Sequence, residues 1–510
     1  MATRVIPPKL LRSVTRPRTS ATTTAVPPPY FTAHKLQPSP QQPTLQQPGI
    51  VNRFVTPTAS SVLNLDDHEK IFSSLSTVQM LRSSAILQMA ATESVVDLGL
   101  WVMRSQLMEI KGVRDVLLST IKHSFYEHFC AGEDAKEAKE SLLKVNESGL
   151  RGMLVYGVEH TCDVDACERN LNGFTSAVDI ASSLPKSSTS YVVVKITAIV
   201  PLDLLERVSD LLRWQQRDPS FNLPWKLDTF PVFSESSPLY HTMSKPEPLT
   251  PQEEQNIKQG HERLLKLCQR CVEANVPLVV DAEDTQLQPA IDYLTYSSAI
   301  VHKNADNPVL YGTIQAYLKD AKDRLLLVSK SAEKMGVPIG FKLVRGAYMS
   351  SETKLANSLG FDSPIHNSIQ ETHNCYNDCA SFMLDKIADN ASTGVILATH
   401  NVESGKLAAT KARDLGIKRG NGRLEFAQLY GMSDALSYGL GNAGFHVSKY
   451  MPYGPVDVVM PYLLRRAEEN RGMLSSSSLD RHLMRKELMR RIKAAALPKF
   501  EMQGYPQHSV

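Results

Sequence analysis

Two adjacent arginines in a stretch of helical periodicity raise the first chemical question of this sequence. The segment reads "YLLRRAEEN" over residues 462–470, with Arg465 and Arg466 side by side. Residues three or four positions apart share one side of a helix, so Tyr462 and Glu469 would lie beside the arginines. Such a pattern is often a solvated surface. Paired guanidinium groups could instead hold a carboxylate through forked, charge-assisted hydrogen bonds.

Polar side chains also recur where short apolar segments end. A single polar residue at such a position is commonly a helix cap or a lysine whose side chain extends to solvent. Many together describe a large, cation-rich pocket with room for a phosphate-bearing cofactor and an anionic substrate. The set comprises Glu159, Lys195, Asp281, Gln315, Lys342, Arg345, Tyr348, Thr399, His400, Asn401, Glu425, Gln428 and Tyr450.

The segments that must position these residues are eight candidate strands separated mostly by helical stretches. They lie at 151–160, 190–200, 276–283, 308–315, 339–348, 393–401, 423–431 and 445–454. Parallel strands need crossover helices, so the alternation predicts an α/β fold. A TIM-like (βα)8 barrel over residues 149–475 is the simplest architecture, with its chemistry at the carboxyl ends of the strands. An open doubly wound sheet is the alternative.

Three segments lie outside or interrupt the alternation. Residues 66–148 show helical spacing without strand punctuation, which predicts an all-helical N-terminal region. Residues 201–249 are an elaboration with one extra helix. Residues 1–65 are rich in Pro, Ser, Thr and Gln and carry seven basic residues and no acid. That composition is typical of an organelle transit peptide followed by a disordered spacer; a plain disordered tail is the alternative.

The C-terminal segment, residues 476–510, is expected to form a basic helical tail. Its apolar stripe would comprise Met484, Leu488, Ile492 and Ala495, with basic side chains beside it. This helix could lie on an anionic membrane or pack on the outside of the barrel. Both alternatives stay open at the level of sequence.

Several function classes find no support. The chain has 56 basic and 53 acidic residues, and without the leader 49 and 53, so no basic footprint for nucleic acid remains. No long uncharged apolar stretch predicts a transmembrane span. The cysteines of "CQRC" and "CYNDC" are expected to be packed thiols, without a metal site. "GLGNAG", residues 439–444, precedes a strand and is expected to be a flexible turn, which argues against an NAD site.

Seven motifs occur in a fixed order: "VKITAI", "DAE", "KLVRGAY", "ATHN", "EFAQLYGM", "YMPYG" and "YLLRRAEEN". The set resembles the flavin-dependent proline dehydrogenases over residues 149–472, and with its leader the chain is similar to the mitochondrial enzymes of plants. The resemblance implies a distorted (βα)8 barrel that binds FAD at the carboxyl ends of its strands, with the eighth helix across the mouth. It implies oxidation of L-proline to Δ1-pyrroline-5-carboxylate, with electrons passed to a membrane quinone.

The resemblance also assigns residues. Those implied at the substrate are Lys195, Asp281, Tyr348, Leu429, Tyr450, Arg465 and Arg466. Those implied at the flavin are Gln315, Lys342, Val344, Arg345, Gly346, Thr372, Thr399, His400, Asn401 and Glu469. Glu159 matches a first-strand glutamate of the family. Bacterial members have Arg in place of Lys342 and Lys in place of Arg345. These exchanges keep the positive charge but not the planar fork of donors.

The implied reaction needs a neutral substrate amine, and the sequence places no obvious base. Positive charge around the amine is expected to lower its pKa, so that activity rises with pH. Leu429, Tyr348 and Tyr450 would form the wall that selects ring size. A mitochondrial location on the matrix side of the inner membrane is implied, with peripheral membrane contact. The alternatives are oxidation of hydroxyproline, decided near Tyr450, another flavin barrel such as a folate reductase type, and a non-enzymatic relic.

Overall fold

The strands of this chain close into a parallel barrel. The computed structural model describes residues 62–389, 392–472 and 476–496. Within them, eight strands pair in chain order and β1 also pairs with β8. The strands are β1 Arg151–Tyr156, β2 Thr189–Val194, β3 Leu278–Val280, β4 Leu310–Gln315, β5 Ile339–Val344, β6 Thr393–Ala398, β7 Leu424–Leu429 and β8 Val447–Tyr453. Each falls in or within one residue of a predicted segment, which confirms the (βα)8 barrel.

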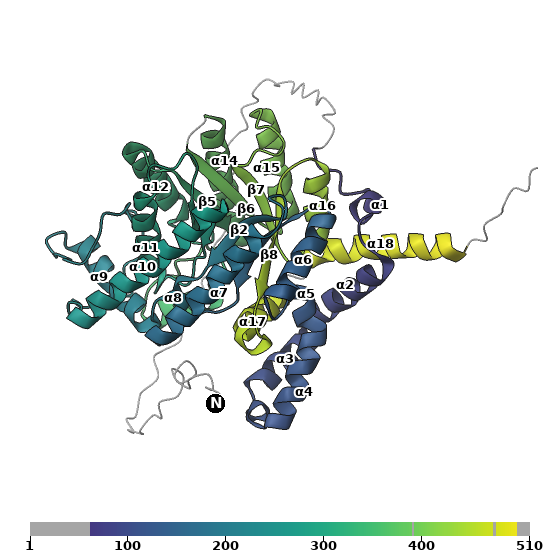
Figure 1. Ribbon diagram of the computed structural model, residues 1–510, viewed down its shortest axis with the longest axis horizontal. Helices are drawn as coiled ribbons and strands as arrows, with labels where there is room; N and C mark the ends of the chain where they lie inside the picture. The colour runs from purple at the N-terminus through teal and green to yellow at the C-terminus, as the bar shows by residue number, and fades with distance from the viewer. Residues whose placement is uncertain (1–61, 390–391, 473–475, 497–510) are drawn as a thin grey trace, which may run out of the picture. The chain divides into compact units, whose positions relative to one another are not determined.

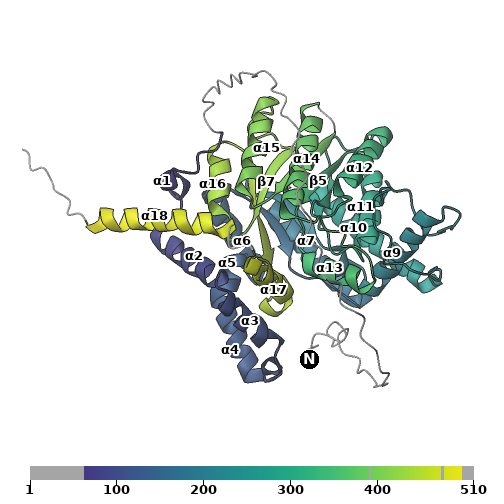
Figure 2. The same cartoon turned by 180° about the vertical axis from the view of Figure 1, so that it is seen from behind.

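The helices between the strands surround this barrel (Figure 1). They are α7 Val164–Ser182, α8 Ile196–Ile199, α9 Leu202–Arg217, α10 Pro251–Ala274, α11 Gln288–Val301, α12 Ala321–Met335, α13 Met349–Ser358, α14 Ile369–Ala388, α15 Val402–Asp414 and α16 Asp434–Asn442. After β8, α17 runs from Val456 to Gly472. Helix α10 begins with a capping box, in which Thr250 and Glu253 satisfy each other's backbone N–H groups. Seen from behind, α13 and α17 lie at the same end of the barrel (Figure 2).

Two local predictions were wrong. The apolar run at 190–200 is not one strand, because β2 ends at Val194 and α8 begins after Lys195. An uninterrupted apolar run does not distinguish a buried strand from a buried helix. The glycine-rich segment after β7 is not a flexible turn throughout, because Gly439 and Gly441 lie inside α16. Only Gly444 has the positive φ of a turn.

Two aromatic rings meet inside the barrel. Tyr191 and Tyr311 meet edge to face with centroids 5.1 Å apart. A Cβ at Gly340 or Gly394 would lie within 2.3 Å of the Tyr311 side chain, so glycines on β5 and β6 make room for this ring. The core is therefore packed, and polar chemistry is left to the ends of the strands.

One polar residue of the predicted set lies at the other end of the barrel. Glu425 is fully buried near the start of β7, where it accepts a hydrogen bond of 2.9 Å from Arg151, the first residue of β1. Ser448 also donates to its carboxylate. A buried ion pair at the amino-terminal end of the barrel lies away from the end where barrel chemistry occurs, so Glu425 does not belong to the candidate site.

The N-terminal region is helical, as predicted, and packs on the barrel. Its helices are α1 His68–Ile71, α2 Thr77–Ala90, α3 Glu93–Arg104, η2 Gln106–Glu109, α4 Lys111–Ile121, η3 Lys122–Tyr126, α5 Glu127–Phe129 and α6 Ala135–Glu147. The Tyr126 hydroxyl donates to the Gly454 carbonyl at 2.7 Å, and the Ala131 N–H donates to the Pro452 carbonyl at 2.7 Å. These bonds fix the region beside the carboxyl end of β8.

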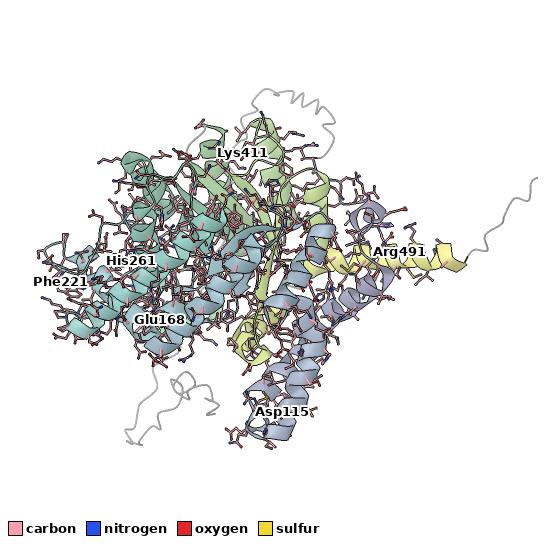
Figure 3. The ribbon with its side chains drawn as sticks, in the orientation of Figure 1. Asp115, Glu168, Phe221, His261, Lys411 and Arg491 are labelled. Carbon is pink, nitrogen blue, oxygen red and sulfur yellow. The ribbon has the colours of Figure 1, made fainter. Side chains whose placement is uncertain are left out.

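The C-terminal helix α18, Ser476–Ala496, packs against α1, α2 and α16. Met484 and Leu488 of its apolar stripe are buried, and only Ile492 and Ala495 are exposed. Arg491, labelled in Figure 3, donates to the carbonyls of Phe72 and Leu75 at 2.9 and 2.7 Å. The prediction that this helix packs on the outside of the barrel is therefore confirmed for Met484 and Leu488. Residues 1–61 of the predicted leader and the residues after 496 of the tail lie outside the described residues. The predicted disordered spacer ends too late, because Leu63 and Leu65 are buried in the main core.

All seven cysteines are free thiols, and those of "CQRC" and "CYNDC" are buried, as expected. Among the residues the structure describes, no cluster of His, Cys, Asp and Glu could hold a metal ion. No single described helix is long and apolar enough to cross a membrane. The pair Thr77–Ala90 and Glu93–Met103 meets that criterion by length and composition, but it is bent by 76°.

Candidate active site

The side chain of Asp281 contacts residues in or directly after three other strands. It directly follows β3, and its carboxylate accepts from the Lys342 ammonium on β5. The Tyr450 hydroxyl on β8 donates to Asp281 Oδ2 at 2.7 Å. Lys195 directly follows β2, and its Nζ lies 3.3 Å from the same oxygen of Asp281. Residues far apart in sequence therefore form one buried polar group at the carboxyl end of the barrel.

The charges of this group hold one another in the ionised state. Burial alone would raise the pKa of Asp281, but Lys342 and Lys195 lower it well below its usual range. Burial alone would lower the pKa of Lys195, but Asp281 raises it above its ordinary value. Both groups thus remain charged throughout the physiological pH range.

Arg465 reaches this mouth from α17 and contacts a second carboxylate. Its guanidinium makes a forked contact with Glu159, in which NH2 donates to Oε2 at 2.7 Å and NH1 donates to Oε1. The side chains of Arg465 and Glu159 are only 18% and 3% exposed, so this is not a solvated surface pair. Lys195 Nζ lies 3.7 Å from Glu159 and links the two carboxylates.

The pKa values reflect this pairing. Burial alone would raise the pKa of Glu159, but Arg465 and Lys195 lower it to about 2. The pKa of Arg465 is raised by Glu159 despite its burial. The contact is therefore a fixed ion pair at the entrance to the strand-end cluster, and it holds α17 over the barrel mouth.

Arg466 lies on the same side of α17 and stacks on an aromatic ring. Its guanidinium carbon is 5.3 Å from the centre of the Tyr462 ring, within the range of a cation–π contact. The Tyr462 ring is 6.4 Å from that of Tyr450. The predicted common side of Tyr462, Arg465 and Arg466 thus faces the strand-end cluster. The side chain of Glu469 lies outside the part of the chain that the structure describes.

Arg345, just after β5, forms a second cationic centre with neutral partners. It donates to Thr399 Oγ1 at 2.5 Å, to Ser404 Oγ at 2.9 Å and to His373 Nδ1 at 3.1 Å. Its guanidinium carbon also lies 4.4 Å from the centre of the Tyr376 ring. Among the described residues no carboxylate pairs with Arg345, and burial lowers its pKa. This charge is therefore available to an anionic group.

The loop after β6 is fixed by hydrogen bonds to its neighbours. Asn401 caps α15 by accepting from the Ser404 N–H at 2.8 Å, and its amide contacts His373 Nε2 at 3.3 Å. His400 Nε2 accepts from the Leu429 N–H at 3.1 Å. Burial, with Lys449 and other nearby cations, lowers the pKa of His400 to about 3, so its ring is neutral at physiological pH.

The remaining residues of β4 and β5 that were predicted to contact the flavin lie at the same strand ends. Gln315 is buried and donates to the Glu283 carbonyl at 2.8 Å. Val344 ends β5, and Gly346 follows with a φ of +133°. A Cβ at Gly346 would lie 2.3 Å from the Tyr317 ring, so glycine is required where the loop passes over this ring.

Three other predicted residues are less closely tied to the cluster. Tyr348 immediately precedes α13, near enough to Lys195 and Arg465 for both charges to act on its pKa, which burial raises. Leu429 ends β7 and packs against the apolar cluster that includes residues of α17. Thr372 is buried in the first turn of α14, beside His373, and it is His373 that contacts Arg345.

Some members of the site were missed by sequence reasoning or received no role. His373 joins Arg345 to Asn401 but stands in no recognisable motif; its position next to Thr372 was the only signal. His160 adopts a positive φ of 57°, and its Nε2 lies 3.2 Å from Glu283 Oε2. Glu283 was visible in "DAE" at the end of β3, but its histidine partner could be found only from the fold.

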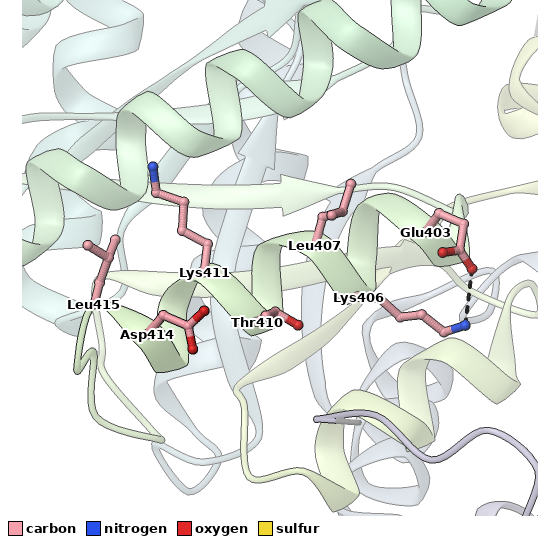
Figure 4. A pocket seen from close by; sticks show the side chains of 7 residues that line it. All are labelled: Glu403, Lys406, Leu407, Thr410, Lys411, Asp414 and Leu415. Atoms are coloured by element: carbon pink, nitrogen blue, oxygen red, sulfur yellow. Dashed lines mark hydrogen bonds and ion pairs between the residues drawn. The ribbon is translucent and has the colours of Figure 1, made fainter. Parts of the chain in front are cut away.

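A pocket elsewhere on the molecule does not bear on this site. It lies along the outer face of α15, where Glu403 and Lys406 are paired across one end (Figure 4). Its lining residues are Glu403, Lys406, Leu407, Thr410, Lys411, Asp414 and Leu415. None of them was predicted at the site, and none belongs to the strand-end cluster described above.

The closed barrel, the helix across its mouth and the buried charges define a (βα)8-barrel protein with a polar, charged group at the carboxyl ends of its strands. The family model described as proline dehydrogenase matches residues 140–479. A mitochondrial protein of Arabidopsis thaliana, proline dehydrogenase 2, is 59% identical over 454 residues, which cover 89% of this chain and 95% of that protein. The chain belongs to the proline dehydrogenase family.

Two further similarities bear on the alternatives. Hydroxyproline dehydrogenase of Xenopus laevis is 32% identical over 378 residues, which cover 73% of this chain and 78% of that protein. The crystal structure of proline utilization A from Bdellovibrio bacteriovorus, inactivated by N-propargylglycine, matches with a TM-score of 0.55 at 21% identity. That match covers 82% of this chain and 39% of the other, so it shows a common fold over part of a longer protein.

Proposed function

We propose that this chain oxidises L-proline to Δ1-pyrroline-5-carboxylate, the first step of proline breakdown, with FAD as cofactor and a membrane quinone as electron acceptor. The observation that carries the proposal is the buried pair of cationic centres at the barrel mouth, around Asp281 and around Arg345. It occurs in a chain that is 59% identical to a named proline dehydrogenase. One centre suits a small zwitterion and the other suits a phosphate-bearing group.

The substrate would lie between the Asp281 cluster and α17. Arg465 and Arg466 would bind its carboxylate, since Arg465 is already held in place by Glu159 and Arg466 by the Tyr462 ring. The residues proposed to contact the substrate are Lys195, Asp281, Tyr348, Leu429, Tyr450, Arg465 and Arg466. Fixed cations of this kind orient the substrate and lower the entropy cost of reaching the reactive geometry.

FAD fits the second centre because Arg345 has only neutral partners among the described residues. Bound there, the flavin would supply the two-electron acceptor for the ring carbon beside the substrate nitrogen. The residues proposed to hold it are Gln315, Lys342, Val344, Arg345, Gly346, Thr372, Thr399, His400, Asn401 and Glu469. The Asn401-capped start of α15 adds N–H groups suited to an anion.

The substrate amine must lose its proton before oxidation, because its lone pair assists removal of the hydride. Lys195, Lys342, Arg465 and Arg466 surround the proposed position with positive charge. The carboxylates Asp281 and Glu159 are each occupied by cations and are poor proton acceptors, since their pKa values are lowered. The residues of this chain would therefore favour the neutral amine, and the proton would leave to solvent.

Hydroxyproline oxidation is the second candidate, because a hydroxyproline dehydrogenase is also similar to this chain. The higher identity to the proline enzyme, 59% against 32%, favours proline. Another flavin-dependent barrel oxidoreductase is the remaining alternative. Purified full-length protein, assayed with each imino acid and a soluble dye acceptor, tests the proposal. Higher kcat/KM for L-proline, with a cyclic imine product and FAD released on denaturation, is expected; activity with neither substrate would refute it.

The place of action is part of the same proposal. The chain would work in the mitochondrion, on the matrix side of the inner membrane, in peripheral contact with the bilayer that carries the quinone. The composition of residues 1–65 and the mitochondrial name of the Arabidopsis relative support this location. The buried stripe of α18 is not available for the membrane contact over Met484 and Leu488.

A further inference from the structure

Large apolar side chains are exposed on α3 and α4, which form a hairpin through η2. Leu98 and Trp101 on α3 are 60% and 62% exposed, and Val116 on α4 is 67% exposed. Ile110, at the turn between the helices, is 55% exposed. Figures 1 and 2 show α3 and α4 side by side, and Figure 3 places Asp115 near the end of the hairpin farther from the barrel. Several large apolar side chains exposed on two adjacent helices are typical of an interaction surface.

The two faces of α3 have different environments. Val96 and Leu100, at helical spacing, are buried, and Met103 packs with the apolar cluster that contains Tyr462 and Leu463 of α17. The opposite face presents Leu98 and Trp101. The hairpin is thus anchored on the helix that carries Arg465 and Arg466, while the outer face of α3 is left apolar and exposed.

We propose that the exposed face of the α3–α4 hairpin inserts into the interface of a lipid bilayer and holds the barrel mouth beside the membrane. The inference rests on the proposed function in one respect, which is that the electron acceptor is dissolved in that membrane. Contact through the hairpin would place α17 near the bilayer, so that a membrane-bound acceptor could approach the site without leaving the lipid.

Three observations favour a bilayer over other partners. Tryptophan together with aliphatic residues is enriched in helices that bind at membrane interfaces. The pair α2–α3 has the length and apolar composition of a membrane segment, but it is bent by 76° and α2 packs against α18, so it does not form a straight span. The hairpin is nearly neutral, with Glu93, Asp97, Glu109 and Asp115 against Arg104, Lys111 and Arg114. Binding should therefore be hydrophobic and only weakly dependent on anionic lipid.

The test uses the full chain and phosphatidylcholine vesicles, with and without cardiolipin. The wild type should co-sediment with both, and the amount bound should be similar at about 0.15 M and 1 M salt. The double variant Leu98→Gln/Trp101→Gln should bind at least roughly tenfold more weakly, because two large side chains no longer favour the apolar phase. The control Val301→Gln/Leu407→Gln changes two residues that are 58% and 57% exposed elsewhere, and it should bind as the wild type does.

Fluorescence provides an independent measurement. Lipids brominated on their acyl chains should quench Trp101 in the bound wild type. Trp101→Phe should remove most of this quenching while retaining vesicle binding, because Phe keeps an apolar ring at the same position. Unchanged quenching in Trp101→Phe would show that another part of the chain enters the lipid and would overturn the proposal.

Other outcomes separate the surface from the proposed reaction. Equal binding of the double variant and the wild type would overturn the proposal, as would binding that requires cardiolipin and disappears at high salt. A wild-type dimer that the double variant dissociates, without vesicle binding, would assign the face to a second copy instead. Proline oxidation with a soluble dye should be equal in wild type and double variant. If the wild type itself does not oxidise proline with the dye, the proposed reaction is refuted, but the membrane contact is not.

Discussion

Arg465 on α17 makes a forked contact with Glu159, 306 residues earlier in the chain, where β1 leads into the barrel mouth. The pair joins the helix that covers the site to the barrel that forms it. Its low exposure excludes the surface-helix interpretation of "YLLRRAEEN" for Arg465. The contact also fixes the orientation from which Arg465 and its neighbour Arg466 would meet a substrate carboxylate.

Glu159→Ala should destabilise the protein, because it leaves the Arg465 guanidinium buried without its carboxylate. Loss of one partner of a buried ion pair costs roughly 3–5 kcal/mol in the free energy of unfolding. Urea unfolding would measure the change. Glu403→Ala, which removes an exposed carboxylate paired with Lys406, is the matched control and should have little effect. Equal midpoints for both variants would mean that the Arg465 contact contributes nothing.

The stability of the wild type should fall in acid as Glu159 takes up a proton. Its folded pKa of about 2 lies below the ordinary carboxyl value, so the stabilisation is present above about pH 4.3 and is lost as the pH falls toward 2. The shift corresponds to on the order of 3 kcal/mol. Asp281, whose pKa is also lowered, acts in the same direction. Unfolding followed across this range should show a shallower decline for Glu159→Ala, and parallel curves would contradict the assignment.

Tyr450→Phe should weaken proline oxidation and relax its specificity. The substitution removes the 2.7 Å hydrogen bond to Asp281 and opens space on the pocket wall. A hydrogen bond to a charged group contributes about 1.5–3 kcal/mol, so kcat/KM for proline should fall roughly tenfold or more. The ratio of kcat/KM for proline over hydroxyproline should fall as well. Tyr453 lies on the same strand as Tyr450, and its hydroxyl donates to the Gly173 carbonyl on α7. Tyr453→Phe should therefore keep the wild-type ratio.

The rate with bound proline should rise with pH between about pH 6 and pH 9 and then level off. The surrounding cations favour the neutral amine, and the carboxylates nearest to it are already paired with cations. Stopped-flow reduction at saturating proline isolates this step from substrate capture. A flat profile would mean that the amine binds already deprotonated or that a residue of the site takes its proton.

The fold could be predicted almost completely because its signals are local. Short β-branched runs between helical segments determine the parallel strands, and parallel pairing of eight such units closes a barrel. The end of β2 was misplaced, since Val194 and Ile196 are equally apolar although one ends a strand and the other begins a helix. The helical conformation of Gly439 was also not predicted, because glycine favours turns. Gly439 is helical because it packs closely against Leu65, and the sequence pattern does not reveal that contact.

The site was predictable in its residue types but not in its pairings. The motifs name Arg465, Lys195 and Asp281, yet the contact of Arg465 with Glu159 exists only because the barrel closes and α17 crosses its mouth. Likewise, Arg345 binds His373, and no spacing between them suggests a contact. Ion pairs between distant segments depend on the closed fold, which sequence periodicity does not encode.

The most direct test of the central claim is anaerobic titration of the purified holoprotein with L-proline, followed by the visible absorption of the bound flavin. The wild type should be bleached at low proline concentrations. Arg465→Met and Arg466→Met should keep their flavin but need roughly 10- to 150-fold more proline, because each loses a charged hydrogen bond to the carboxylate. The control Arg413→Met, on the exposed face of α15, should titrate like the wild type. Identical titrations for all four proteins would contradict the account.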